Sequence, residues 1–189
     1  HSRNYDEALV VSETALGLDK ENPHSHDVRG VALHGLGRSK DALHSFRRAL
    51  KINPHYISAR VNMSSALLEL NEYEVAIEHL ERATKIEPRN PQIFNNLGLA
   101  HAGRAQYRES EEHLRIAIKF LPKFAEAHFN LSRVLLMQGK YQEGWQENEW
   151  RWKCQSFPST WRDFPYARWQ GEPVKGKTVL VWSEQGIGD

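Results

Sequence analysis

A period of 34 residues runs through most of this sequence and constrains its fold more than any other feature. Prolines recur with this period at Pro54, Pro88 and Pro122. Small residues keep the same period in three columns, which are Ala15, Ala49, Ala83 and Ala117; Ala8, Ala42, Ala76 and Ser110; and Gly30, Ser64, Gly98 and Ser132. Because protein interiors are densely packed, small residues are favoured where two helices touch. The columns therefore predict a stack of similar helical units.

Residues 90–122 show what one period encodes. Apolar side chains lie at helical spacing in each half of this segment, at Phe94, Leu97 and Leu99 and then at Tyr107, Leu114, Ala117 and Ile118. The stretch 103–106 separates the halves, so two amphipathic helices must fold back on each other. The proline column fits the end of the second helix, since proline cannot continue the hydrogen-bond ladder. We expect about four such hairpins.

The period and the small-residue columns resemble the tetratricopeptide repeat family over residues 1–153. An aromatic residue opens the second helix in the family, and the matching positions are Tyr73, Tyr107 and Tyr141. Gly37 and Gly139 match the turn between the helices, whereas Ser39, Asn71 and Ala105 depart from the pattern. The resemblance implies an all-α, right-handed solenoid that binds a protein or a peptide.

The two ends of the sequence differ from the repeats between them. Residues 1–18 match a second helix without its first, and the sequence begins with His1, so we expect an upstream segment to be missing. Residues 154–176 form a connector rich in aromatic residues and proline. Residues 177–182 have the pattern of a buried strand, and a glycine turn follows in 183–189. We expect this strand to have no sheet to join within the chain.

A second resemblance covers residues 141–189. The runs YQEGWQENEWRWK, WQGEPVKGKTVLVW and EQGIGD resemble the junction in bacterial proteins that join tetratricopeptide repeats to a glycosyltransferase-like domain. The resemblance implies that residues 177–189 open a truncated α/β domain. Gly186 and Gly188 would then belong to its phosphate or nucleotide-sugar loop, and its catalytic residues would lie beyond Asp189. We expect this chain to recruit substrates or partners for such an enzyme and not to be catalytic by itself.

A column of asparagines gives the candidate binding site. Asn62, Asn96 and Asn130 recur in the first helices, and asparagine is a mediocre helix former, so local propensity does not explain them. The amide group can donate and accept, and could hold the backbone of an extended peptide. The column resembles the asparagine ladder of the O-GlcNAc transferase superhelix, which implies peptide binding in a concave groove. Arg133 lies on the same stripe. The alternative is a structural hydrogen bond between repeats.

Composition excludes several other classes of function. The net charge of +1 provides no strong field for nucleic acid or an anionic membrane. Cys154 is the only cysteine, which excludes an intrachain disulfide and favours a reducing compartment, so we predict a cytoplasmic protein. No apolar run has the length of a membrane span. The ten histidines show no zinc-ligand spacing, and we expect no metal and no cofactor.

The tryptophan-rich end supports a different class of function. Trp145, Trp150 and Trp161 follow the last hairpin, and large aromatic side chains need a large apolar partner. We expect them to pack together or on that hairpin. Alternatively, this end is exposed and joins copies of the chain in a homo-oligomer.

Overall fold

A computed structural model describes residues 2–154, 157, 165 and 173–178 of the chain. The described part holds nine α-helices and a short 3₁₀ helix, and no strand. The helices are α1 (Ser2–Leu18), α2 (Pro23–Gly35), α3 (Ser39–Ile52), α4 (Ile57–Glu69), α5 (Tyr73–Ile86), α6 (Pro91–Gly103), α7 (Tyr107–Phe120), α8 (Ala125–Met137), α9 (Tyr141–Asn148) and η1 (Glu149–Lys153). The prediction of an all-α solenoid is confirmed.

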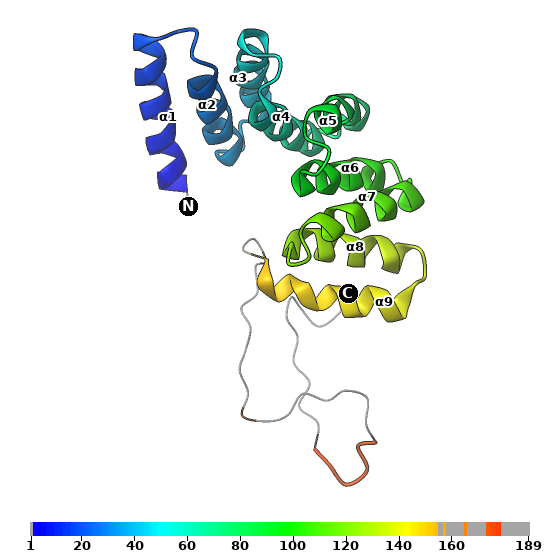
Figure 1. Cartoon of the computed structure of the whole chain (residues 1–189). Helices are drawn as coiled ribbons and strands as arrows, with labels where there is room; N and C mark the ends of the chain where they lie inside the picture. The colour runs from blue at the N-terminus through cyan, green and yellow to red at the C-terminus, as the bar shows by residue number, and fades with distance from the viewer. Residues whose placement is uncertain (1, 155–156, 158–164, 166–172, 179–189) are drawn as a thin grey trace.

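The helices form a curved stack of antiparallel pairs (Figure 1). Each first helix, α2, α4, α6 or α8, packs on its own second helix and on the next first helix along the chain. Among the described residues, the second helices α3, α5, α7 and α9 make no comparable contacts with one another. Since the first helices approach each other more closely, they line the inner side of the curve. We call this side the inner face.

The small-residue columns lie where the two helices of a pair touch. A Cβ atom added to Gly30 would lie 2.4 Å from the ring of Phe46 on α3, and one added to Gly98 would lie 2.5 Å from Leu114 on α7. In the alanine columns, five residues are completely buried, namely Ala42, Ala49, Ala76, Ala83 and Ala117. The predicted reason for the columns, close approach of two backbones, is confirmed.

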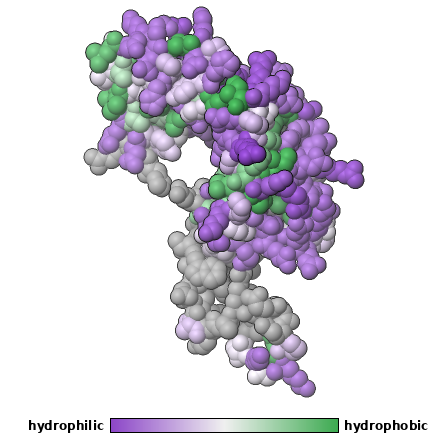
Figure 2. Space-filling model, in the orientation of Figure 1, coloured by the Kyte–Doolittle hydropathy of each residue, from purple (hydrophilic) through white to green (hydrophobic). Residues whose placement is uncertain are grey.

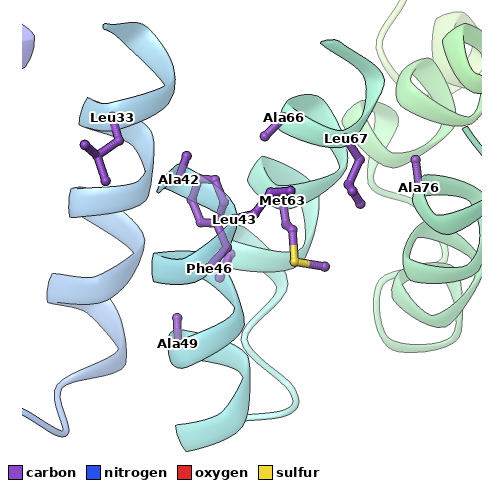
Figure 3. Close-up of a cluster of buried hydrophobic side chains, with 10 residues drawn as sticks. Leu33, Ala42, Leu43, Phe46, Ala49, Met63, Ala66, Leu67 and Ala76 are labelled. Atoms are coloured by element: carbon purple, nitrogen blue, oxygen red, sulfur yellow. The ribbon is translucent and has the colours of Figure 1, made fainter. Parts of the chain in front are cut away.

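The hydrophobic core is continuous from one helical pair to the next. Figure 3 shows one cluster, in which Phe46 and Leu43 from α3 meet Met63 and Leu67 from α4. A second cluster joins α5 to α6, and a third joins α7 to α8. Full burial of one large apolar side chain contributes about 1.5–3 kcal/mol. Much of that contribution requires the neighbouring pair, so no pair is stable alone.

Helix boundaries follow from local chemistry. Asn22 and Asn90 cap α2 and α6, and each side chain accepts a hydrogen bond from a backbone N–H of the first turn. The second helices α3, α5 and α7 end two residues before the proline column, as predicted. Between the two helices of a pair, one residue has a positive φ angle in every case; the angles are 74° for Gly37, 59° for Asn71, 57° for Ala105 and 76° for Gly139.

The C-terminal end agrees only partly with expectation. Trp150 stacks on His128 of α8, with ring centroids 4.0 Å apart, so it packs on the last hairpin as predicted. Trp145 does not, because 60% of its surface is exposed. Its counterparts Leu43 and Ile77 are buried under the next first helix, and no described helix covers α9 in that way. Trp161, Gly186, Gly188 and most of the predicted strand lie outside the described residues; Lys177 and Thr178 belong to no helix or strand.

Candidate protein-binding face

The three asparagines of the predicted column lie on consecutive first helices. Asn62 is on α4, Asn96 on α6 and Asn130 on α8. Each side chain reaches back to the preceding first helix and donates a hydrogen bond there. The column is therefore a series of bridges between neighbouring helical pairs along the inner face.

Asn96 is wholly engaged inside the protein. Its Nδ2 atom donates to the hydroxyl oxygens of Ser64 and Ser65, at 3.1 Å in both cases. Its Oδ1 atom accepts hydrogen bonds from the side chains of Gln92 and Asn95. Only 2% of the residue is exposed. These contacts support the inter-repeat role that the sequence left open for Asn96, and they place its amide inside the wall of the inner face.

Asn62 closes a polar cluster between α2 and α4. Its Nδ2 atom donates to Oδ1 of Asp27 at 3.0 Å, and the hydroxyl of Ser58 donates to Oδ2 of the same carboxylate at 2.6 Å. Asp27 is 4% exposed. Burial, followed by the charge of Asp27 and a hydrogen bond to it, raises the pKa of Tyr56. Neutral donors therefore hold the carboxylate of Asp27 at this junction.

Asn130 makes the corresponding bridge at the last junction. Its Nδ2 atom donates to Oδ1 of Asn95 at 3.0 Å. The acceptors Asp27 and Asn95 share one column of the period and stand 35 residues before Asn62 and Asn130. Sequence reasoning missed these acceptors, although the shared spacing could have revealed them. Within the described part of the chain, Oδ1 of Asn62 and of Asn130 makes no hydrogen bond, so both oxygens keep acceptor capacity.

Beside these bridges, the inner face has a mixed surface. Arg133 and Met137 of α8 and Val31 of α2 are exposed, and Ser65 and Leu99 are partly exposed. Arg133 makes no ion pair with any residue that the structure describes. Figure 2 shows hydrophobic residues gathered along the hollow side of the bend and hydrophilic residues on its outer side. Such a surface suits an extended segment with apolar side chains and an unpaired backbone.

An aromatic cluster marks the C-terminal end of the inner face. Phe157 meets Phe129 of α8 edge to face, with ring centroids 5.8 Å apart, and also meets Trp152 at 5.4 Å. The guanidinium of Arg151 lies over the ring of Trp152 at 4.5 Å. Phe129 belongs to the same column as Asp27 and Asn95. The chain itself therefore supplies an aromatic side chain at this end of the face.

The buried histidines belong to the packing between helices. His113 of α7 stacks on His101 of α6, with ring centroids 5.1 Å apart, and its Nδ1 atom is buried without a partner in the described part of the chain. Burial lowers the pKa of His113, and the neighbouring His101 lowers it further. Burial, then the charges of Arg60 and Arg82, lowers the pKa of His79 to about 4. Among the described residues, no three potential ligands come together as a metal site.

Models of the tetratricopeptide repeat match three segments of the chain. One matches residues 23–56, a second matches residues 97–144, and a third, described as TPR repeat, matches residues 64–103. The helical pairs of this chain are tetratricopeptide repeats. We refer to the pairs α2/α3, α4/α5, α6/α7 and α8/α9 as the first to fourth repeats. No helix in the described part of the chain is long and apolar enough to cross a membrane.

Two curated proteins illustrate the sequence relationships. Protein FlbA of Caulobacter vibrioides is 25% identical over 183 residues, which cover 97% of this chain and 26% of FlbA. The TPR repeat-containing thioredoxin TTL4 of Arabidopsis thaliana is 36% identical over 73 residues, 39% of this chain and 11% of TTL4. The chain thus spans about a quarter of the first relative and about a tenth of the second.

Solved structures share the fold. MamA from Desulfovibrio magneticus RS-1 superposes with a TM-score of 0.67 at 24% identity and covers 76% of this chain and 81% of its own. TTC0263, a TPR protein of Thermus thermophilus, gives a TM-score of 0.70 at 22% identity, covering 76% and 79%. PilF of Pseudomonas aeruginosa gives 0.69 at 21% identity, covering 78% and 67%. At these identities the likeness extends to the solenoid alone.

Proposed function

We propose that the chain is a protein-interaction scaffold whose inner face binds an extended segment of a partner protein. The observation that carries the proposal is the continuity of this face, because α2, α4, α6 and α8 pack side by side along four repeats. Tetratricopeptide repeats generally mediate interactions between proteins, and the likeness to FlbA and MamA fits a scaffold.

The binding surface consists of the accessible groups between the asparagine bridges. Leu99 provides apolar contact, and Arg133 provides a cation without an ion-pair partner among the described residues. Oδ1 of Asn62 and of Asn130 can accept hydrogen bonds from the backbone N–H groups of the ligand. Asn96 supports these residues from inside the wall. A ligand amide that binds such an oxygen contributes about 1 kcal/mol.

In a longer protein, this scaffold would recruit partners or substrates for other domains. The sequence of residues 141–189 favours a glycosyltransferase-like domain as the downstream neighbour. That part of the proposal rests on the sequence resemblance alone and is tested by sequencing the gene beyond Asp189. A stop codon directly after Asp189 would eliminate it.

Peptide display tests the inner face directly. A random peptide library is selected on the chain, and the affinities of the selected peptides are measured by fluorescence anisotropy against variants. Leu99→Ser and Arg133→Ser should each weaken binding about tenfold, the usual effect of losing about 1.4 kcal/mol. Val75→Ser is the matched control, because Val75 is an exposed residue of the second helix α5. Equal affinity for all variants would remove the inner face as the binding site.

A further inference from the structure

The last second helix, α9, presents aromatic side chains to solvent. Tyr141 is 64% exposed and Trp145 is 60% exposed. The two residues are four positions apart, so they lie on one face of the helix. We call Tyr141 and Trp145 the α9 face. It points along the axis of the stack and lies outside the inner face.

The same positions of α5 show what such a face is built to contact. Tyr73 and Ile77 stand 68 residues before Tyr141 and Trp145 and are covered by α6. Ile77 is 9% exposed, and it packs in a cluster with Ile93 and Leu97 of α6.

Glycine allows the tyrosine ring to lie against the covering helix. The ring of Tyr73 is so close to Gly103 that an added Cβ atom would lie 2.3 Å from it. The first junction repeats this arrangement, since the ring of Tyr5 on α1 would lie 2.6 Å from a Cβ atom added to Gly35 of α2. In both cases the glycine is the last residue of the covering helix. Tyrosine on the second helix is thus matched by glycine at the end of the next first helix.

The third junction shows how this chain builds the same position when it is polar. Glu111 of α7 corresponds to Trp145 and accepts hydrogen bonds from Arg115, Gln138 and Lys140. Burial would raise the pKa of Glu111, but hydrogen bonds from Lys140, Gln138 and Arg115 outweigh it and hold the pKa at about 2. The fourth repeat carries tryptophan at this position instead. Exposed large aromatic residues are typical of the centres of protein interfaces.

We propose that the α9 face binds an α-helix of a partner protein, which packs on it as a further first helix of the stack. The partner helix is amphipathic and carries glycine in its last turn, where it meets the ring of Tyr141. Its apolar side covers Trp145, as α6 covers Ile77. A hollow of about 480 Å³ beside Tyr141, lined by Lys140, Gln142 and Gln146 among others, gives room at the start of the face.

A helical peptide copied from α6 is a suitable probe, because α6 already covers the equivalent face of α5. The peptide has the sequence of residues 89–104 and is held helical by a hydrocarbon staple between positions 92 and 99. In the chain, Gln92 and Leu99 lie on the accessible side of α6, so the staple leaves the packing side free. The peptide is titrated into the ¹⁵N-labelled full chain, and the indole N–H signals are followed by NMR.

We expect the indole signal of Trp145 to shift and saturate during the titration. Trp145→Ser should weaken binding at least tenfold, and a peptide with Gly103→Leu should bind at least fivefold more weakly than the parent peptide. Leu18→Ser is the control, because Leu18 is an exposed apolar residue of α1 at the opposite end of the stack. Binding to this variant should be unchanged.

Three results would overturn the proposal. The first is equal binding by the Trp145→Ser chain, and the second is equal binding by the Gly103→Leu peptide. The third is a shift of the Trp145 signal that follows the concentration of the chain alone and is accompanied by a dimer in sedimentation. That result would assign the α9 face to a second copy of the chain.

Discussion

The side chain of Asn96 donates hydrogen bonds to Ser64 and Ser65 across the junction between the second and third repeats. Asn62 and Asn130 make the equivalent bridges at the neighbouring junctions. One amide column therefore helps to set how consecutive first helices lie against each other. The inner face depends on this relationship, because its accessible groups keep their spacing only while the first helices keep theirs.

Replacement of Asn96 by alanine should destabilise the protein. The variant removes four hydrogen bonds from a site that is 2% exposed, and it leaves the partners of Asn96 in the wall without their amide. Unsatisfied buried polar groups cost about 1–3 kcal/mol, so the free energy of unfolding in urea should fall by about 2 kcal/mol. Asn130→Ala is the matched control and should cost less, because Asn130 is partly exposed and makes one bridge. Equal losses for both variants would contradict this account.

The contact of Gly30 with Phe46 can be tested by a double substitution. Gly30→Ser places a side chain where the Phe46 ring already lies, 2.4 Å from the Cβ position, so it should cost about 2 kcal/mol or more. The second repeat holds Ser64 and Leu80 at the equivalent positions, and both are fully buried. Adding Phe46→Leu copies that pair and should recover part of the loss. The coupling energy from urea denaturation should be favourable by about 1 kcal/mol; additive losses would show that the two residues do not compete for space.

Ala105→Gly should stabilise the third repeat. Ala105 has a φ angle of 57°, a conformation that costs an L residue roughly 1 kcal/mol and that glycine adopts freely. Gly37 and Gly139 hold the equivalent turns of the first and fourth repeats. The thermal midpoint should rise by a few degrees, the usual effect of about 1 kcal/mol in a chain of this size. Gly37→Ala is the reverse control and should lower the midpoint.

The sequence predicted the repeats well because their signal is redundant. Small residues, prolines and apolar residues all follow one period, so substitutions such as Asn71 and Ala105 at the turn do not hide the pattern. The positive φ angles at these two residues show that the turn keeps its geometry when glycine is absent. Backbone geometry is therefore maintained along the stack more strictly than residue type.

The details of the site depended on contacts that one column cannot reveal. The period placed Asn62, Asn96 and Asn130 together, but it did not show whether the amides turn outwards or towards the preceding helix. That choice depends on acceptors in other columns, Asp27 and Asn95, which come near only after the first helices stack. The exposure of Trp145 was missed for a related reason, because the burial of its position depends on the helix that follows in the stack.

Acid should destabilise the fold in a window set by two histidines. Burial and the charges of Arg60 and Arg82 lower the pKa of His79 to about 4, and burial also lowers the pKa of His113. Both histidines are neutral in the folded and unfolded states above about pH 6.5, the ordinary histidine value. Below that pH the unfolded chain takes up protons that the folded chain does not, so the free energy of unfolding falls as the pH drops towards 4.

The loss between pH 7 and pH 5 should be on the order of 1–2 kcal/mol, measured by urea denaturation at each pH. Glu111 does not contribute to this window. Its pKa of about 2 lies below the ordinary value of 4.5, so the stability from Glu111 is present above about pH 4.5 and is lost only as the pH falls towards 2. The double variant His79→Gln/His113→Gln should flatten the slope between pH 7 and pH 5 and keep the loss below pH 4. A parent-like slope between pH 7 and pH 5 would show that other groups take up the protons.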